Sequence, residues 1–295
     1  MRRLIAGAAL LGAACLSLGL WITRADPLPA GIYDDLAGDA ARGEAVFWAG
    51  GCASCHMAPE AEGDAQLVLT GGQAFPSDFG TFYAPNVSMH PEDGIGAWTA
   101  DEFASAVQRG VSPEGAHYFP VFPYAAYRLA NPQDIVDLWA FWQTLPAAEG
   151  ARPAHDIAFP FSIRRGVGVW KQLYGSADFT GPGPEADVER GRYLAEALSH
   201  CAECHTPRTA LGGLDRSRWM AGAPNPSGPG RIPNITPAEL TWSEDEIEAY
   251  LTDGFTPEFD VAAGHMRHVV ENLARLPDGD RAAIAAYLKA LPPRE

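Results

Sequence analysis

The chain has 295 residues, of which 47% are hydrophobic and 20% charged, so its composition disfavours a disordered protein and suits two domains of ordinary size. Its formal net charge is −16, and a surface this acidic repels phosphate backbones. No nucleic-acid partner is therefore expected, and the charge suits either a partner with a basic docking face or simple solubility.

Residues 1–25 are predicted to form an apolar helix that is either a membrane anchor or a secretion signal. Arg2 and Arg3 precede an apolar stretch of about 20 residues, which is long enough to cross a bilayer. A cleavable signal usually has a shorter apolar core and a small-x-Ala cleavage site, of which residues 23–25 are a poor version. An uncleaved anchor is therefore favoured, and in either case the bulk of the chain is exported.

The pattern Cys-x-x-Cys-His occurs twice, as "GCASCH" at residues 51–56 and "HCAECH" at residues 200–205, while Cys15 lies in the apolar stretch. A zinc site would have to bring together two pairs that are 149 positions apart, and a thioredoxin-type site needs a βαβ context that the sequence lacks. Covalent attachment of c-type haem instead uses every residue of the pattern. Each cysteine forms a thioether to the porphyrin, and the histidine binds the iron.

The sequence therefore predicts two covalently bound haem c groups per chain. The residues assigned to them are Cys52, Cys55 and His56 for haem 1, and Cys201, Cys204 and His205 for haem 2. This attachment takes place on the exported side of a membrane, which agrees with the apolar N-terminus. We expect the protein on the periplasmic side of the bacterial inner membrane, held there through its N-terminal helix.

The sequences that flank the two motifs repeat each other, which predicts two homologous units at residues 36–148 and 186–293. A segment rich in proline and glycine at residues 149–185 joins them. Within it "FPFSIRR" and "GVGVWKQLYG" are expected to form either an interdomain brace or a docking surface, of which the brace is favoured. The matching pairs are "APNVS" with "IPNIT", "WTADEFASAVQRGVSPE" with "WSEDEIEAYLTDGFTPE", and "LWAFWQTLP" with "IAAYLKALP".

Each unit is expected to place a helix before its motif, at residues 39–48 and 189–198, and a last helix that ends near residues 145–146 and 291–292. Gly43 and Gly191 would let the first helix approach the last one closely, opposite an aromatic side chain (Phe141 or Tyr287).

Between these helices each unit is expected to have a loop-rich middle with a turn at Asn86 or Asn234. A further helix follows, for which Thr99 or Ser243 is a plausible N-cap. No alternating pattern is strong enough to predict a sheet, so the predicted fold class is all-α, with two tandem domains and an N-terminal helix.

The second axial ligand of each iron decides what the haem does. For haem 2 the predicted ligand is Met266, which lies in "AAGHMRHVV" just after a glycine-rich turn. A thioether ligand there favours the reduced iron and raises the reduction potential. Met220 follows Trp219 in the loop-rich middle and is expected to serve core packing.

For haem 1 the repeat places Phe122 where Met266 stands, and phenylalanine cannot bind iron. Three alternatives stay open at this point. His117 could bind the iron, the iron could be five-coordinate and open, or Met89 or His90 could reach in from "NVSMHPEDGIG".

The chain resembles the membrane-associated multihaem cytochrome c subunits of bacterial periplasmic dehydrogenases for alcohols, gluconate and other polyols. The resemblance rests on "GEAVFWAGGCASCHMAP", "GGQAFPSDFGTFYAPNVS", "GIGAWTADEFASAVQRGVSPEGAHYFPVFPYAAY", "FPFSIRR", "CAECHTPRTALGG" and "AAIAAYLKALPP". It implies the class I cytochrome c fold in each unit and an electron-relay role. It also implies two partners, a periplasmic dehydrogenase subunit and a downstream acceptor, either quinone or the respiratory chain. Members of the family usually carry three haems and a methionine where Phe122 stands.

The favoured function is thus electron transfer without catalysis by this chain. The alternative is a haem redox enzyme that acts on peroxide or a sulfur oxyanion at an open or histidine-ligated haem 1, an idea that Phe122 motivates.

Overall fold

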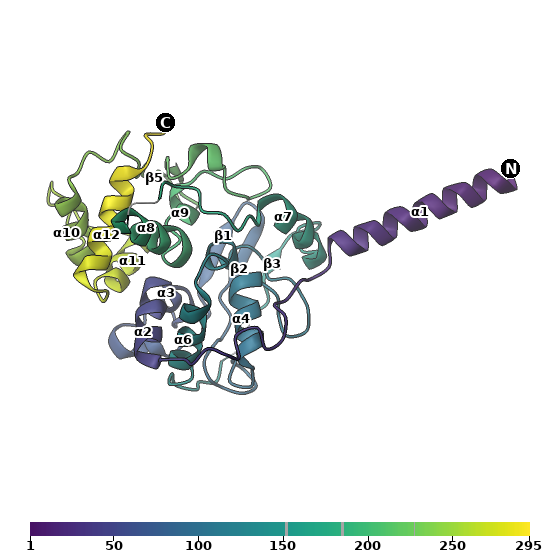
Figure 1. The fold of residues 1–295 in the computed structure, drawn as a ribbon, viewed down its shortest axis with the longest axis horizontal. Helices are drawn as coiled ribbons and strands as arrows, with labels where there is room; N and C mark the ends of the chain where they lie inside the picture. The colour runs from purple at the N-terminus through teal and green to yellow at the C-terminus, as the bar shows by residue number, and fades with distance from the viewer. Residues whose placement is uncertain (151–152, 184–185, 227) are drawn as a thin grey trace.

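The computed structural model describes residues 1–150, 153–183, 186–226 and 228–295. Residues 151–152 and 184–185 of the predicted linker lie outside the described residues. Figure 1 shows two helical units side by side, with the helix α1 (Arg2–Ile22) extending away from both. No residue of α1 is buried, and by length and composition α1 could cross a membrane.

The first unit and the linker contain α2 (Ala40–Ala49), α3 (Cys52–His56), η1 (Gly63–Leu67), β1 (Ala74–Ser77), β2 (Gly80–Tyr83), α4 (Ala100–Arg109), α5 (Tyr124–Tyr127), α6 (Pro132–Trp142), β3 (Asp156–Ile157), η2 (Arg164–Gly166) and α7 (Val167–Tyr174). The second unit contains α8 (Ala186–Arg192), η3 (Tyr193–Leu198), α9 (Ala202–His205), η4 (Arg216–Arg218), β4 (Ala223–Pro224), β5 (Arg231–Ile232), α10 (Glu244–Asp253), α11 (His265–Leu273) and α12 (Asp278–Ala290).

In both units the helix before the motif crosses the last helix at a glycine, as the sequence predicts. A Cβ atom built on Gly43 of α2 would lie 1.9 Å from the carbonyl oxygen of Asp137 on α6. One built on Gly191 of α8 would lie 1.8 Å from the carbonyl oxygen of Ala283 on α12. Because no side chain fits at these distances, the two crossings require glycine.

The predicted N-caps are also confirmed. The Thr99 hydroxyl accepts a hydrogen bond from the Glu102 amide, and the Ser243 hydroxyl accepts one from the Glu246 amide, both at 3.2 Å. Each glutamate carboxylate in turn accepts a hydrogen bond from the backbone amide of the cap residue, so both helices begin with a complete capping box.

The second unit has one extra residue between its helix-crossing glycine and its motif. Cys52 follows Gly43 by nine positions, whereas Cys201 follows Gly191 by ten. The helix accommodates this residue as a π-helical turn, η3, which continues α8. The position before the first cysteine then has a left-handed backbone in both units, with φ of +62° at Gly51 and +41° at His200.

The all-α prediction is wrong in one respect, because the loop-rich middles contain short antiparallel strands. β1, β2 and β3 form a three-stranded sheet in that order, and β4 pairs with β5. Strands of two to four residues are too short to show an alternating pattern. β3 comes from the linker and pairs through Ile157 with Gly80 of β2, a contact across the chain that sequence pattern cannot reveal.

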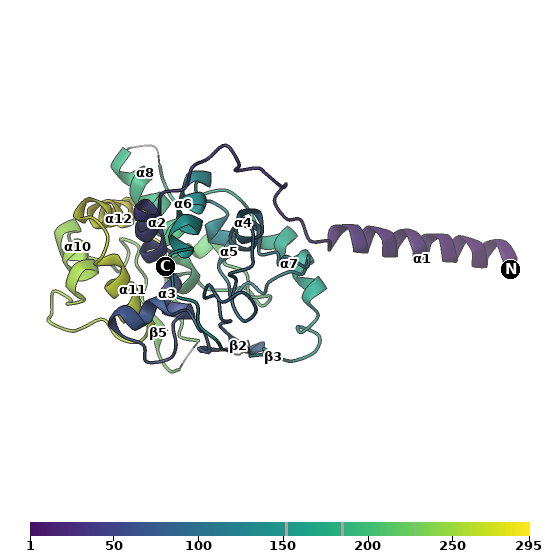
Figure 2. The same cartoon turned by 90° about the horizontal axis from the view of Figure 1, so that it is seen from below.

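The linker helix α7 braces the two units, as expected. The Lys171 ammonium donates hydrogen bonds to the carbonyl oxygens of Arg109, at 2.5 Å, and Gly110, at 2.8 Å, in unit 1. The Trp170 indole donates one to the Leu211 carbonyl of unit 2, at 3.1 Å. Figure 2 shows that α7 also lies beside the base of α1.

The units also touch directly, and their buried side chains form one continuous apolar core. The Asn272 amide of α11 donates a hydrogen bond to the Ser54 hydroxyl of α3, at 2.7 Å. The Arg275 guanidinium lies 4.0 Å from the centre of the Trp48 ring. Contacts of this kind place α3, which carries the first motif, at the interface with unit 2.

Candidate functional site

The histidines of the two motifs lie in matching environments. The ring Nδ1 of His56 is 3.0 Å from the Pro85 carbonyl oxygen, and that of His205 is 2.8 Å from the Pro233 carbonyl oxygen. A carbonyl only accepts, so Nδ1 carries the proton and Nε2 keeps its lone pair. Among the described residues, no hydrogen bond occupies Nε2 of either ring.

Burial lowers the pKa of both His56 and His205, although the proline carbonyls partly oppose this shift. Both rings are therefore neutral at neutral pH, and a neutral imidazole is the form that binds a metal. The fixed tautomer and the free Nε2 fit the role of an axial iron ligand.

An asparagine holds each proline carbonyl in place. The Asn86 side chain accepts a hydrogen bond from the Ser88 amide, at 2.9 Å, and donates one to the Ala148 carbonyl, at 2.8 Å. The Asn234 side chain accepts from the Thr236 amide, at 2.8 Å, and donates to the Arg294 carbonyl, at 2.7 Å. The predicted turns at Asn86 and Asn234 are thus confirmed, and each joins the histidine loop to the end of its unit.

A glycine in each unit lets this loop approach the histidine. The amides of Gly71 and Gly222 donate hydrogen bonds to the carbonyl oxygens of His56, at 2.7 Å, and His205, at 2.8 Å. Both glycines have left-handed backbones, and a Cβ on Gly71 would lie 2.5 Å from the backbone of Pro85. The repeat aligns the two prolines with each other but does not mark them as histidine partners, and nothing in the sequence distinguishes Gly71 from Gly72.

The cysteine thiols lie in surroundings that favour their neutral form. Burial raises the pKa of Cys52 and of Cys201 to about 12, and burial together with the nearby Cys204 raises that of Cys55 to about 11. A reactive dithiol or a zinc site needs thiolates, which such surroundings disfavour. Within the described residues, moreover, no three His, Cys, Asp or Glu side chains converge on a possible metal position.

The two motifs lie next to each other across the interface between the units. Cys55 is close enough to Cys204 for the charge of one thiol to affect the pKa of the other. The Tyr127 hydroxyl donates a 2.6 Å hydrogen bond to the Gly50 carbonyl, and its ring meets His200 edge-on, with ring centres 5.5 Å apart. One tyrosine therefore contacts the residues that lead into both motifs.

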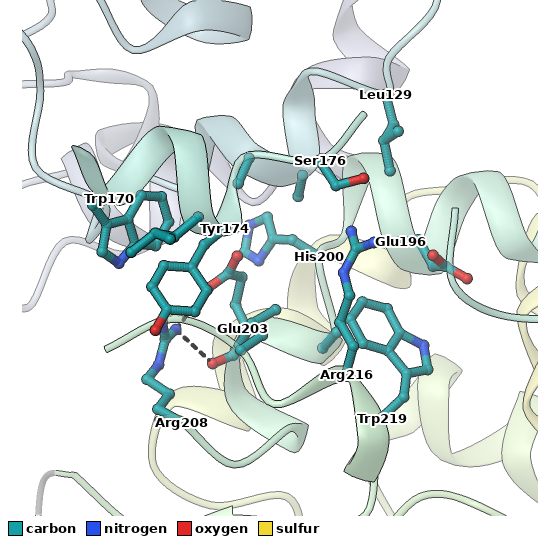
Figure 3. A pocket seen from close by; sticks show the side chains of 15 residues that line it. Leu129, Trp170, Tyr174, Ser176, Glu196, His200, Glu203, Arg208, Arg216 and Trp219 are labelled. Carbon is teal, nitrogen blue, oxygen red and sulfur yellow. Dashed lines mark hydrogen bonds and ion pairs between the residues drawn. The ribbon is translucent and has the colours of Figure 1, made fainter. Parts of the chain in front are cut away.

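A cleft of about 280 Å³ lies beside the second motif, lined by residues of α5, α7 and α9. Figure 3 shows the side chains that line it. The cleft reaches Ala202 and Glu203, the two residues between Cys201 and Cys204. An ion pair of 2.6 Å joins Glu203 to Arg208 at its edge, and Trp170 and Tyr174 of α7 also line it. The outer side of the second motif is thus reached through a cleft that the linker helix completes.

Matching contacts support the alignment of Phe122 with Met266. Short β-bridges join Val111 to His117 and Phe255 to Val261, with the same offset of 144 positions. The amides of Tyr118 and Ala262 bond the carbonyls of Gly110 and Gly254, each at 2.8 Å and again with this offset. Beyond these contacts, Phe122 and Met266 are both half-buried and both pack against the core.

The other candidate ligands have contacts of their own. The buried ring of His117 lies with Nε2 3.1 Å from the Thr23 carbonyl oxygen, and burial lowers the His117 pKa. His90 Nδ1 accepts from the Asp93 amide at 3.0 Å, and Met89 is half-buried against the core. Met220 is fully buried in the core, as its predicted packing role requires.

Comparisons with known proteins agree over most of the chain. The model of the family described as cytochrome c matches residues 40–146 and 188–292. A dihaem cytochrome c-type protein of Cereibacter sphaeroides is 54% identical and covers 99% of this chain and 98% of its own length. The fructose dehydrogenase cytochrome subunit of Gluconobacter japonicus is 36% identical, and the cytochrome c subunit of alcohol dehydrogenase (quinone) of Gluconacetobacter polyoxogenes is 32% identical. Both cover 85% of this chain, which spans 52% and 56% of their lengths.

Proposed function

Because the chain belongs to the cytochrome c family, we propose that it is a dihaem electron carrier that serves a periplasmic dehydrogenase and passes its electrons to quinone or the respiratory chain. The family membership confirms the resemblance that the motifs indicated. Haem c, when bound, supplies a reversible one-electron couple. The donor assignment draws on the relatives, two of which are cytochrome subunits of a fructose and an alcohol dehydrogenase.

In this proposal the chain's own residues hold and tune the cofactors. The four motif cysteines form the thioethers, and His56 and His205 bind iron through Nε2. The carbonyls of Pro85 and Pro233 orient these rings and increase their basicity through the Nδ1 hydrogen bonds. Met266 is the proposed sixth ligand of haem 2.

The observation that carries the proposal is the pair of matched histidine–proline contacts on two adjacent motifs. The contact of Tyr127 with the approach to both motifs supports direct exchange between the two halves of the chain, because one side chain touches the backbone before the first motif and the ring before the second. The N-terminal helix α1 would hold this assembly on the periplasmic face of the inner membrane.

Phe122 favours a second function, redox chemistry on peroxide or a sulfur oxyanion at haem 1, because its ring provides no ligand atom. Its ring centre lies 6.0 Å from that of Tyr127, so the position faces the interior. His117 is the alternative ligand for this haem. To bind iron through Nε2, its ring would have to give up the Thr23 carbonyl.

Mass analysis and absorption spectra of the purified, haem-loaded chain test these proposals. Two attached haems that both ignore carbon monoxide would support the electron carrier. One haem that binds carbon monoxide, and loses this ability in a Phe122→Met variant, would favour the second function. Phe119→Met is the matched control, since Phe119 is also buried but is not aligned with Met266. A mass corresponding to one haem or none would overturn the dihaem assignment itself.

A further inference from the structure

The linker segment at residues 158–166 is exposed at every position. Its large apolar side chains face solvent: Phe159 is 81% exposed, Phe161 47% and Ile163 51%. An exposed apolar surface of this kind on a globular protein usually marks an interaction site. The residues that follow, 167–174, form α7, which is hydrogen-bonded to both units and so fixes the segment relative to them.

The same segment is bonded to the end of α1. The Arg165 guanidinium donates hydrogen bonds to the Leu20 carbonyl, at 2.6 Å, and to the Thr23 hydroxyl, at 2.9 Å. Gly168 lies against the Thr23 backbone, where an added Cβ would approach to 2.7 Å. Figures 1 and 2 both show α7 beside the base of the extended helix. If α1 crosses a bilayer, this segment must lie where the helix leaves the bilayer.

The charge of the segment differs from that of the whole chain. Residues 158–174 contain no acidic residue, although the chain as a whole has a net charge of −16. Arg164 and Arg165 are exposed, whereas the Lys171 ammonium is bonded to the Arg109 and Gly110 carbonyls. Basic side chains beside exposed aromatic and aliphatic ones suit the boundary between lipid phosphates and acyl chains. The bonds to α1 favour a lipid surface over a dehydrogenase subunit, because they hold the segment beside the proposed membrane anchor.

We propose that residues 158–166 form a membrane contact, in which Phe159, Phe161 and Ile163 insert into the outer leaflet of the inner membrane and Arg164 lies near lipid phosphates. The contact rests on the proposed anchoring through α1. Together with α1 it attaches the two globular units to the bilayer at two points, which restricts how they tilt relative to the membrane.

The test uses the full-length, haem-loaded protein in vesicles of phosphatidylethanolamine and phosphatidylglycerol that contain a photoactivatable phospholipid. Lipid adducts are mapped to peptides by mass spectrometry. We expect adducts on α1 and on residues 158–166, and none on residues 255–261. That control segment carries Phe259, which is 90% exposed but belongs to unit 2, far from α1 in Figure 1.

A Phe159→Ser/Phe161→Ser variant should lower the adduct yield on residues 158–166 at least about tenfold, because losing the burial of even one large apolar side chain has an effect of this size, and should leave adducts on α1 unchanged. Phe259→Ser is the matched control and should change neither yield. Adducts on α1 alone would overturn the contact and leave the anchoring intact. Adducts on neither segment, or a mature chain that lacks α1, would overturn both, and equal labelling of residues 255–261 would show non-specific insertion and overturn the contact.

Discussion

The two units are built on the same contacts around their motif histidines but differ in what covers the turn that precedes the proposed sixth-ligand position, Phe122 in unit 1 and Met266 in unit 2. In unit 1 the Lys171 ammonium bonds the Gly110 carbonyl, and the Thr23 carbonyl bonds the ring of His117. In unit 1 the bridged residues Val111 and His117 are 1% and 5% exposed, whereas their equivalents in unit 2, Phe255 and Val261, are 52% and 55% exposed. The repeat thus preserves the histidine site, while the linker and N-terminus have covered one copy and left the other accessible.

The two units also differ in the residue at the proposed sixth-ligand position. In unit 1 the residue at this position is Phe122, before the four-residue helix α5. In unit 2 it is Met266, at the start of the nine-residue helix α11. We therefore expect the two halves to differ in ligation and potential, with the accessible unit 2 more suited to exchange electrons with a soluble partner.

The largest effect should come from the helix crossings, where the two units are most alike. Gly43→Ala and Gly191→Ala should each lower the free energy of unfolding by about 3 kcal/mol or more, because backbone must move to admit a methyl group. Gly279→Ala is the control, since nothing lies within 4 Å of that position on α12, and it should stabilise the chain by roughly 0.5–1 kcal/mol. Denaturant titrations of the haem-loaded protein measure all three, and a large loss in only one unit would mean that the crossings are not equivalent.

The next largest effect, on the midpoint potentials, should differ between the two units. Met266→Leu should lower the midpoint potential of one haem by on the order of 100 mV, within the ~0.8 V range that axial ligands span. Phe122→Leu should leave both potentials nearly unchanged, because neither side chain binds iron. A potentiometric titration followed by absorption compares them. Unchanged potentials in Met266→Leu would remove Met266 as a ligand.

The asparagines that hold the proline carbonyls should again give equal effects in the two units. Asn86→Ala and Asn234→Ala should each cost about 1–3 kcal/mol of stability, since each removal leaves buried backbone groups without partners. Asn131→Ala serves as the control, because the exposed Asn131 side chain makes no capping bond, and should change stability by less than about 0.5 kcal/mol. If only one of the two buried asparagines mattered, the histidine sites would not be equivalent.

The smallest effect should be the pH dependence of stability that Lys171 causes at the turn of unit 1 that it covers, near Gly110. Burial lowers the pKa of Lys171 to about 7 from an ordinary value of 10.5. Between these values the unfolded chain binds a proton that the folded chain does not, so this group makes stability rise with pH. In denaturant titrations, the unfolding midpoint of the wild type should therefore rise relative to that of the Lys171→Met variant from pH 7 to pH 10. A difference that stays constant or falls over this range would contradict the buried, desolvated position of the ammonium.

Local patterns predicted much of each unit. The capping residues Thr99 and Ser243 begin their helices because a hydroxyl three positions before a glutamate can satisfy free amides within one turn. Gly43 and Gly191 marked the helix crossings because only glycine permits such approach. The roles assigned to the motif cysteines, the motif histidines and Met266 remain predictions, drawn from spacing and from the repeat.

Other features depend on contacts between residues far apart in the chain, so no local pattern could reveal them. The sequence by itself determined the two attachment motifs, the internal repeat and the apolar N-terminus, because these depend on residue type and spacing alone. Only the tertiary structure decided that Pro85 and Pro233 bond the histidines, that β3 completes a sheet, and that the two motifs meet at one interface. Each of these pairings depends on how whole loops and units pack, and such packing is selected by the burial and hydrogen bonding of the entire chain.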